Sequence, residues 1–185
     1  KKDSSNLVGR KILDSEEALD HFYLNESAYT IFNKDKIHRP RNPEIYKAPY
    51  VLFKKGLDCA DYSIRAVYTE SDFLYRETIN CIKGSEKDKK TLLNLCGLLN
   101  SSLFSYFNLM LGSSTGIERE QIFLEELGNY PYVYNDELVE LVEKMQREEW
   151  GKNRNELQVA LNQCVMRMYG LQDNYFVDYA LSIQI

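Results

Sequence analysis

Runs of hydrophobic residues separated by turn residues predict several short β-strands in the first half of the chain. Residues 50–54 form a nearly continuous apolar run. Residues 64–69 are rich in β-branched and aromatic side chains, and residues 75–82 alternate between apolar and polar positions. Such runs, bounded by Gly and charged turn residues, are typical of strands. Together with an earlier run at residues 29–32, they predict a small mixed β-sheet.

An uncharged stretch at residues 91–111 predicts one long amphipathic helix. Small or polar residues recur along one side at steps of three or four; they are Asn94, Gly97, Ser101, Ser105 and Asn108. The other side is an apolar stripe of Leu92, Leu95, Cys96, Leu99, Leu103, Tyr106, Phe107 and Met110. This pattern is typical of a helix that packs on a core, and the polar side argues against a membrane span.

The last part of the chain predicts a helical hairpin. Asn135 is a suitable N-cap, and the apolar positions that follow continue a helix to about Trp150. Residues 153–156 have the capping-box pattern, which opens a second helix. Gly170 follows the last apolar position and is suited to ending that helix.

The order of these elements predicts the fold class and two domains. A short helix is also expected at residues 15–19, and another after Asp173. We expect an α+β protein: a small mixed β-sheet domain with a long packed helix at residues 1–134, followed by a helical hairpin at residues 135–185.

Charge is distributed unevenly along this acidic chain. The net charge of −5 argues against a uniformly basic nucleic-acid binder. Residues 34–55, however, contain seven Lys or Arg and two acids, and His38 lies among them. Residues 136–185 contain nine acids and five bases. A local basic patch can bind phosphates on an acidic protein, and a solvated lysine-rich loop is the alternative interpretation.

The tetrapeptide Asn129-Tyr130-Pro131-Tyr132 differs by one letter from Asn-Pro-Pro-Tyr, the catalytic signature of amino-methyltransferases. In those enzymes the polar side chain and a Pro-Pro carbonyl hold the amino group of a flipped base. Tyr130 replaces the first proline here, and no glycine-rich loop follows a predicted strand to hold a methyl donor. We interpret the tetrapeptide as a structural turn.

Other catalytic and metal-binding patterns are weak. The cysteines Cys59, Cys81, Cys96 and Cys164 have no CxxC spacing, so we expect no metal site. Free thiols without a signal peptide indicate a reducing cytoplasm. Asp72 with Asp88-Lys89-Lys90 loosely matches a metal-dependent nuclease pattern, but acids near lysines are common on charged surfaces.

Four sequence blocks, in a conserved order for one family, carry a more specific signal. They are residues 39–41 (RPR) with 48–56 (APYVLFKKG), residues 98–107 (LLNSSLFSYF), residues 112–115 (GSST) followed by Ile122, Leu127 and Pro131, and residues 165–171 (VMRMYGL). In this order they resemble the target-recognition domains of bacterial restriction–modification proteins. Those domains include the C-terminal specificity domains of adenine-N6 DNA methyltransferases, fused restriction–methylation enzymes and type I specificity subunits. The resemblance covers about residues 37–172.

The resemblance implies a non-catalytic domain that reads double-stranded DNA for a methyltransferase domain or subunit. The chain starts at Lys1 rather than Met, so we expect it to be a piece of a longer protein, whose missing part uses S-adenosylmethionine; no cofactor is expected in this segment. The parent is then a site-specific adenine methyltransferase, and whether it also cleaves DNA stays open. The acidic hairpin departs from the family pattern, which argues against DNA contacts from that half of the chain. The expected DNA-binding residues are Arg39, Arg41, Lys47, Lys54, Lys55, Arg65, Arg76, Ser113, Ser114, Thr115 and Arg119.

Each group of these residues has an expected role. Arg39, Arg41 and the three lysines are expected to contact DNA phosphates, and such contacts set the register of the protein on the duplex. Arg65 and Arg76 lie on predicted strands, and each is expected to present its guanidinium group to the edge of a guanine base. Two other functions remain as alternatives: a protein-interaction or dimerisation module formed by the acidic helices, and a self-contained enzyme. Exposed apolar residues on the hairpin and no DNA affinity at low salt would favour the first.

Overall fold

The central element of the fold is a three-stranded antiparallel sheet. A computed structural model describes residues 1–13, 18–25, 29–57, 62–113, 121–148, 153–171 and 177. The sheet has the order β10-β7-β8, with β7 at Tyr50–Lys54, β8 at Ala66–Thr69 and β10 at Ile79–Lys83. In its register Leu52 lies opposite Val67 on one side and Cys81 on the other. The predicted strand at residues 50–54 is confirmed.

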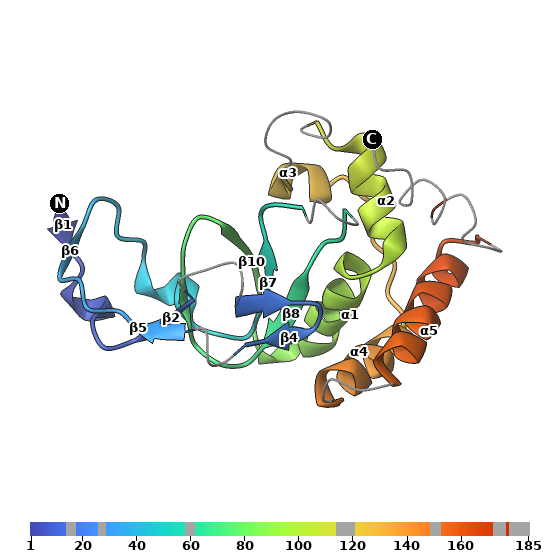
Figure 1. Ribbon diagram of the computed structural model, residues 1–185, viewed down its shortest axis with the longest axis horizontal. Helices are drawn as coiled ribbons and strands as arrows, with labels where there is room; N and C mark the ends of the chain where they lie inside the picture. The colour runs from blue at the N-terminus through green and yellow to red at the C-terminus, as the bar shows by residue number, and fades with distance from the viewer. Residues whose placement is uncertain are drawn as a thin grey trace.

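Smaller sheets extend the fold toward the N-terminus. The second three-stranded sheet has the order β5-β2-β9, where β2 (Lys11–Leu13) pairs antiparallel with β5 (Tyr29–Ile31) and parallel with β9 (Leu74–Tyr75). Two-stranded ribbons are formed by β1 (Lys2–Asp3) with β6 (Lys36–Ile37), and by β3 (Leu19–Asp20) with β4 (Tyr23–Leu24). Figure 1 shows β1, β6, β5 and β2 at one end of the long axis and the helices at the other.

The strand predicted at residues 75–82 is two strands in the structure. A turn separates β9 from β10, and the Ile79 amide donates to the Arg76 carbonyl at 3.1 Å. The Tyr50 hydroxyl accepts from the Phe73 amide at 2.8 Å, which ties the approach to β9 onto β7. The strand predicted at residues 64–69 starts at Ala66. Of the helix predicted at residues 15–19, residues 15–17 lie outside the described residues, and Leu19 is in β3.

The long helix predicted at residues 91–111 is two helices, α1 (Lys89–Leu99) and α2 (Ser102–Leu111). The Ser101 hydroxyl caps α2 by accepting from the Phe104 amide at 3.3 Å. The Asn162 side chain accepts from the Ser102 amide at 3.1 Å. The break arises because Asn100 and Ser101 satisfy backbone groups that a continuous helix would pair internally.

The polar side predicted for that helix is buried rather than facing water. Asn94, Ser101, Ser105 and Asn108 are each at most 3% exposed. Gly97 lies in the α1 surface that contacts α4 (Asp136–Arg147), where an added Cβ would be 2.8 Å from Leu138 Cδ1. Small residues there allow α1 and α4 to approach closely.

The helical hairpin forms with α4 and α5 (Asn153–Met168), which pack against each other, α4 also on α1 and α5 on α2. Asn135 caps α4 as predicted, accepting from the Glu137 amide at 2.7 Å. The helix ends at Arg147, whereas the predicted end near Trp150 and the final helix after Asp173 lie mostly outside the described residues. The division at residue 134 stays a prediction.

Strand β7 lies between two hydrophobic cores. Val51 and Phe53 belong to the core shared with the four long helices, while Tyr50 and Leu52 belong to the core under β2 and β9. All four are fully buried, which explains an apolar run without alternation. Among the described residues, the remaining elements are the short α3 (Leu124–Leu127) and the 3-10 turns η1 (Ser5–Leu7), η4 (Pro43–Tyr46) and η5 (Glu86–Asp88).

The fold is α+β, as predicted. None of the helices that the structure describes is both long and apolar enough to cross a membrane.

Candidate functional site

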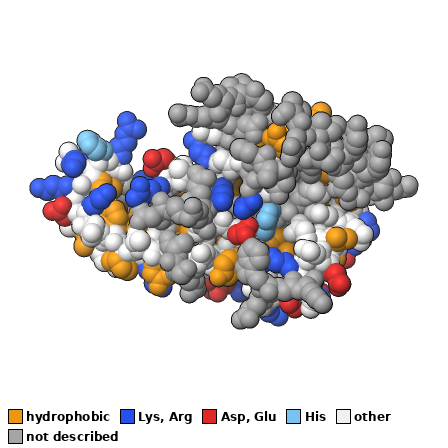
Figure 2. Space-filling view, in the orientation of Figure 1, with side chains coloured by type: hydrophobic (Ala, Val, Ile, Leu, Met, Phe, Trp, Pro, Cys, Tyr) orange, Lys and Arg blue, Asp and Glu red, His pale blue; other side chains and the backbone are white. Residues whose placement is uncertain are grey.

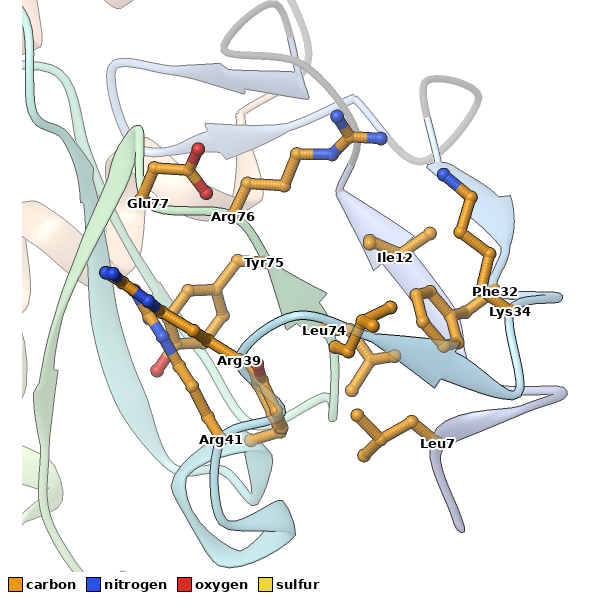
Figure 3. Close-up of a pocket in the computed structure, with 12 residues that line it drawn as sticks. Leu7, Ile12, Phe32, Lys34, Arg39, Arg41, Leu74, Tyr75, Arg76 and Glu77 are labelled. Carbon is orange, nitrogen blue, oxygen red and sulfur yellow. The ribbon is translucent and has the colours of Figure 1, made fainter. Parts of the chain in front are cut away.

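Four basic side chains from two separate parts of the sequence line one concavity, which we call the basic hollow. They are Lys34, Arg39, Arg41 and Arg76, and Glu77 is the acid beside them. The cavity has a volume of about 240 Å³. Its apolar floor consists of Leu7, Ile12, Phe32, Ile37, Tyr46, Leu74 and Tyr75. Figure 3 shows Arg39 and Arg41 extending in the same direction, with Arg76 and Lys34 above the floor.

Each basic residue of the hollow leaves from a connection between elements. Lys34 follows β5, and Arg39 and Arg41 flank Pro40 between β6 and η4. The Asn42 side chain caps η4 by accepting from the Glu44 amide at 3.0 Å. Pro40 and Pro43 restrict the backbone on both sides of Arg41. The hollow is therefore presented by constrained connections.

The floor of the hollow contributes shape without charge. The rings of Tyr46 and Tyr75 meet edge to face with centroids 5.1 Å apart, and the Tyr75 hydroxyl donates to the Ile45 carbonyl at 3.2 Å. Burial raises the pKa of both phenols above the usual value of 10. Both tyrosines therefore stay neutral at physiological pH, and the potential of the hollow comes from its rim.

Three of the four cations of the hollow are not neutralised by described residues. The side chains of Lys34, Arg39 and Arg41 form no hydrogen bond or ion pair with any residue in the described part of the chain. Like charges held close together raise the local positive potential, which favours an anionic ligand. Figure 2 shows Lys and Arg side chains gathered over the N-terminal end of the molecule.

The other predicted basic residues lie outside the hollow. Lys47 pairs with Glu44 at 2.9 Å. Arg65 lies 3.5 Å from Asp20. Lys54 and Lys55 are half-buried at the end of β7, where the Lys55 amide donates to the Thr78 carbonyl at 2.8 Å. The structure therefore brings together Arg39, Arg41 and Arg76 of the predicted residues, and leaves these four elsewhere.

The loop after α2 is described only at its start. Ser113 is exposed, and its amide donates to the Glu126 carboxylate at 3.2 Å. Ser114, Thr115 and Arg119 lie outside the described residues.

Sequence reasoning missed Lys34 and Glu77 as site residues. Lys34 belongs to the basic run, which was a usable signal. Glu77 carries no local signal, because its place in the hollow depends on the pairing of β9 with β2.

The groups of the Asn129–Tyr132 tetrapeptide that a methyltransferase would use are engaged internally. The Asn129 side-chain Nδ2 donates to the Glu125 carbonyl at 3.2 Å, and the Pro131 carbonyl accepts from the Tyr169 hydroxyl. Tyr130 is buried and packs edge to face on Phe104, with ring centroids 6.0 Å apart. This supports the interpretation of a structural turn.

The residues of the loose nuclease pattern also have structural partners. The Asp72 carboxylate accepts from the Ala48 amide at 2.8 Å, and Asp88 accepts from the Ser85 amide at 2.8 Å. Lys89 pairs with Glu70 at 2.7 Å, and Lys90 with Asp136 at 3.0 Å. Within the described ranges, no three His, Cys, Asp or Glu side chains gather as a metal site.

Comparisons with known proteins give a family match and likenesses among solved structures. The model of the TaqI-like C-terminal specificity domain matches residues 10–132, about two thirds of the chain. Among solved structures, a chain of the type IIL restriction–modification enzyme MmeI in complex with DNA is similar at 14% identity and a TM-score of 0.48. That likeness covers 67% of this chain and 19% of the other, so this chain spans a small part of that protein's length. A comparison with curated proteins found no match.

Proposed function

Because this chain belongs to the family of TaqI-like C-terminal specificity domains, we propose that it is the DNA target-recognition domain of a restriction–modification protein. The observation that carries the proposal is the basic hollow, which Lys34, Arg39, Arg41 and Arg76 line on an otherwise acidic chain. The guanidinium groups of Arg39 and Arg41, which have no partner among the described residues, suit phosphate oxygens, because each can make two hydrogen bonds to them. The hollow would hold the DNA backbone and set the register of the domain on the duplex.

The predicted residues divide into two roles under this proposal. Arg39, Arg41 and Lys34 contact phosphates, as do Lys47, Lys54 and Lys55 at the periphery. Arg76 and Arg65 face base edges, and Arg76 is the better placed because it lies at the hollow. Ser113, Ser114, Thr115 and Arg119 meet the backbone from the loop after α2.

Methyl transfer belongs to another domain or subunit in this proposal. The specificity domain would position an adenine-N6 methyltransferase domain, which would bind S-adenosylmethionine and act on a flipped adenine. The described thiols Cys81, Cys96 and Cys164 are free, which suits a protein of the reducing cytoplasm.

The alternative of a protein-interaction module has less support from the hairpin. The apolar residues of α4, namely Leu138, Val139, Leu141, Val142 and Met145, are buried against the rest of the chain. Among the described residues of α4 and α5, Val159 is the exposed large hydrophobic side chain. A docking arm would leave more apolar surface open.

Fluorescence anisotropy with labelled duplex DNA at low salt tests the proposal. The double variant Arg39→Ala/Arg41→Ala should weaken binding to every duplex by about 10-fold or more, since each lost phosphate contact removes a charge-assisted hydrogen bond. The matched control Lys87→Ala/Lys144→Ala removes the same charge from exposed residues outside the hollow and should bind nearly as the wild type does. Equal weakening of both double variants, or no binding by the wild type, would refute the proposal.

A further inference from the structure

One acidic side chain lies among the cations of the basic hollow. Glu77 is exposed, lines the hollow with Arg76, and forms no hydrogen bond or ion pair with any residue that the structure describes. Figure 3 shows its carboxylate near the base of the Arg76 side chain, whose guanidinium group extends away from it on the same side of the floor. A carboxylate close to bound phosphates is unfavourable, because like charges repel. Its position therefore suits a ligand group that donates hydrogen bonds.

The backbone around Glu77 is firmly held. The Arg76 carbonyl accepts from the Ile79 amide at 3.1 Å, which closes a turn over the two intervening residues. The Thr78 carbonyl accepts from the Lys55 amide at 2.8 Å, which fastens this turn to the end of β7. The flanking strands β9 and β10 pair with β2 and β7 respectively. The turn thus presents two adjacent exposed side chains of opposite charge from a fixed scaffold.

This pair of side chains matches the chemistry of a G·C base pair. In the major groove guanine presents the acceptors O6 and N7, and cytosine presents the N4 amino donor. An arginine is the common partner of guanine, and a carboxylate accepts from cytosine N4. We propose that Glu77 is a specificity-determining residue that accepts a hydrogen bond from a cytosine amino group, next to a guanine contacted by Arg76. This inference rests on the proposed function, since it requires duplex DNA at the hollow.

The location of the phosphate-binding residues is consistent with this role. Arg39, Arg41 and Lys34 line the same hollow as Glu77. If these residues hold the DNA backbone at the hollow, the neighbouring major-groove edges of the bases would face the turn that carries Arg76 and Glu77. The simpler interpretation is that Glu77 is only a solvent-exposed charge on the turn. That interpretation predicts no effect of Glu77 on sequence preference.

Selection of bound duplexes from a randomised library, followed by sequencing, distinguishes these interpretations. The wild-type chain should enrich a G·C pair at one position. Glu77→Ala should lower the preference for cytosine there by about 10-fold, the size of one good base contact, without weakening binding overall. Glu77→Gln should admit adenine at that position, because an amide pairs well with adenine N6 and N7. The control Glu140→Ala removes an exposed acid of α4 and should leave the preference unchanged.

Failure of this inference is separable from failure of the proposed function. If Glu77→Ala selects the same sequences as the wild type, or if the wild type binds duplexes without preference, the inference is wrong while DNA binding stands. If the wild type binds no duplex at low salt, both are wrong. Circular dichroism of each variant should match the wild type, since Glu77 and Glu140 are exposed.

Discussion

The side chain of Asn100 holds the backbone of Ala66 by two hydrogen bonds. Its Nδ2 donates to the Ala66 carbonyl at 2.8 Å, and its Oδ1 accepts from the Ala66 amide at 3.1 Å. At the start of β8, the Asn100 carboxamide thereby takes the place of the peptide group that a neighbouring strand would otherwise provide. It also ends α1, since Nδ2 donates to the Cys96 carbonyl at 2.8 Å. One buried side chain joins the sheet to the helix break.

Replacing Asn100 with Ala should destabilise the protein by about 2–3 kcal/mol. The Ala66 amide would lose its partner in a buried site, whereas the Ala66 carbonyl would keep the Phe22 amide at 2.9 Å. Urea unfolding measures the loss. The control Asn129→Ala removes an exposed side chain bonded within its own turn, and should cost less than about 0.5 kcal/mol. Equal midpoints for the two variants would contradict the structural role of Asn100.

Replacing Gly97 with Ala should also destabilise the protein, by about 1–2 kcal/mol. The new Cβ would lie 2.8 Å from both Leu138 Cδ1 and Val142 Cγ2, which belong to fully buried side chains. Overpacking of this kind outweighs the gain in helix propensity of about 1 kcal/mol. Gly128→Ala is the matched control, because its Cβ would meet nothing closer than 3.5 Å. A Gly97→Ala variant that is more stable than the wild type would show that α1 and α4 are less closely packed.

The salt dependence of DNA binding should measure how many phosphate contacts the hollow makes. A plot of log affinity against log salt concentration should lose about 1.8 units of slope in Arg39→Ala/Arg41→Ala, since each phosphate contact contributes about 0.9. The measurement is an anisotropy titration at several salt concentrations. The Lys87→Ala/Lys144→Ala variant should keep the wild-type slope. An unchanged slope in the arginine variant would mean that these side chains do not contact phosphates.

The thermal stability of the protein should depend on pH through the hydrogen bonds that the Asp88 carboxylate accepts from Ser85. Hydrogen bonds from the Ser85 hydroxyl and amide hold the pKa of the Asp88 carboxyl below its usual value of 3.8. A depressed pKa in the folded state adds stability above pH 3.8, which is lost as the pH falls through the lowered value. Asp88→Asn should therefore lower Tm at pH 7, and the difference from the wild type should narrow below about pH 4.

A control separates this local effect from general acid sensitivity. Glu140→Gln neutralises an exposed acid of α4 and should leave Tm within about 1 °C of the wild type at both pH values. A Tm difference between wild type and Asp88→Asn that stayed constant from pH 7 to pH 3 would contradict the proposed linkage.

Elements specified by local pattern were predictable from the sequence. The run at residues 50–54 and the capped helix after Asn135 form as expected, because propensity and capping act over a few residues. The break between α1 and α2 was not predictable in this way. It depends on Asn100 meeting Ala66, which lies 34 residues away in the sequence.

The candidate site was predictable only in part for the same reason. The basic run indicated Arg39 and Arg41, and the four motif blocks indicated the family. The parallel pairing of β9 with β2 brings Arg76 and Glu77 to those arginines, and pairing partners are set by the whole fold. The role of Arg65 stays a prediction; this residue lies one position before β8 begins at Ala66, beside Asp20 and outside the hollow.

Strand β7 contributes side chains to both cores, whereas the charged residues of the hollow leave from connections. A substitution in β7 therefore perturbs packing on two sides at once. A substitution at Lys34, Arg39, Arg41, Arg76 or Glu77 perturbs neither. Under the proposed function, Arg76 and Glu77 can therefore be exchanged without disturbing either core, whereas Lys34, Arg39 and Arg41 are needed for the phosphate contacts. Under that proposal, the residues that hold the fold together are distinct from the two that select the DNA target.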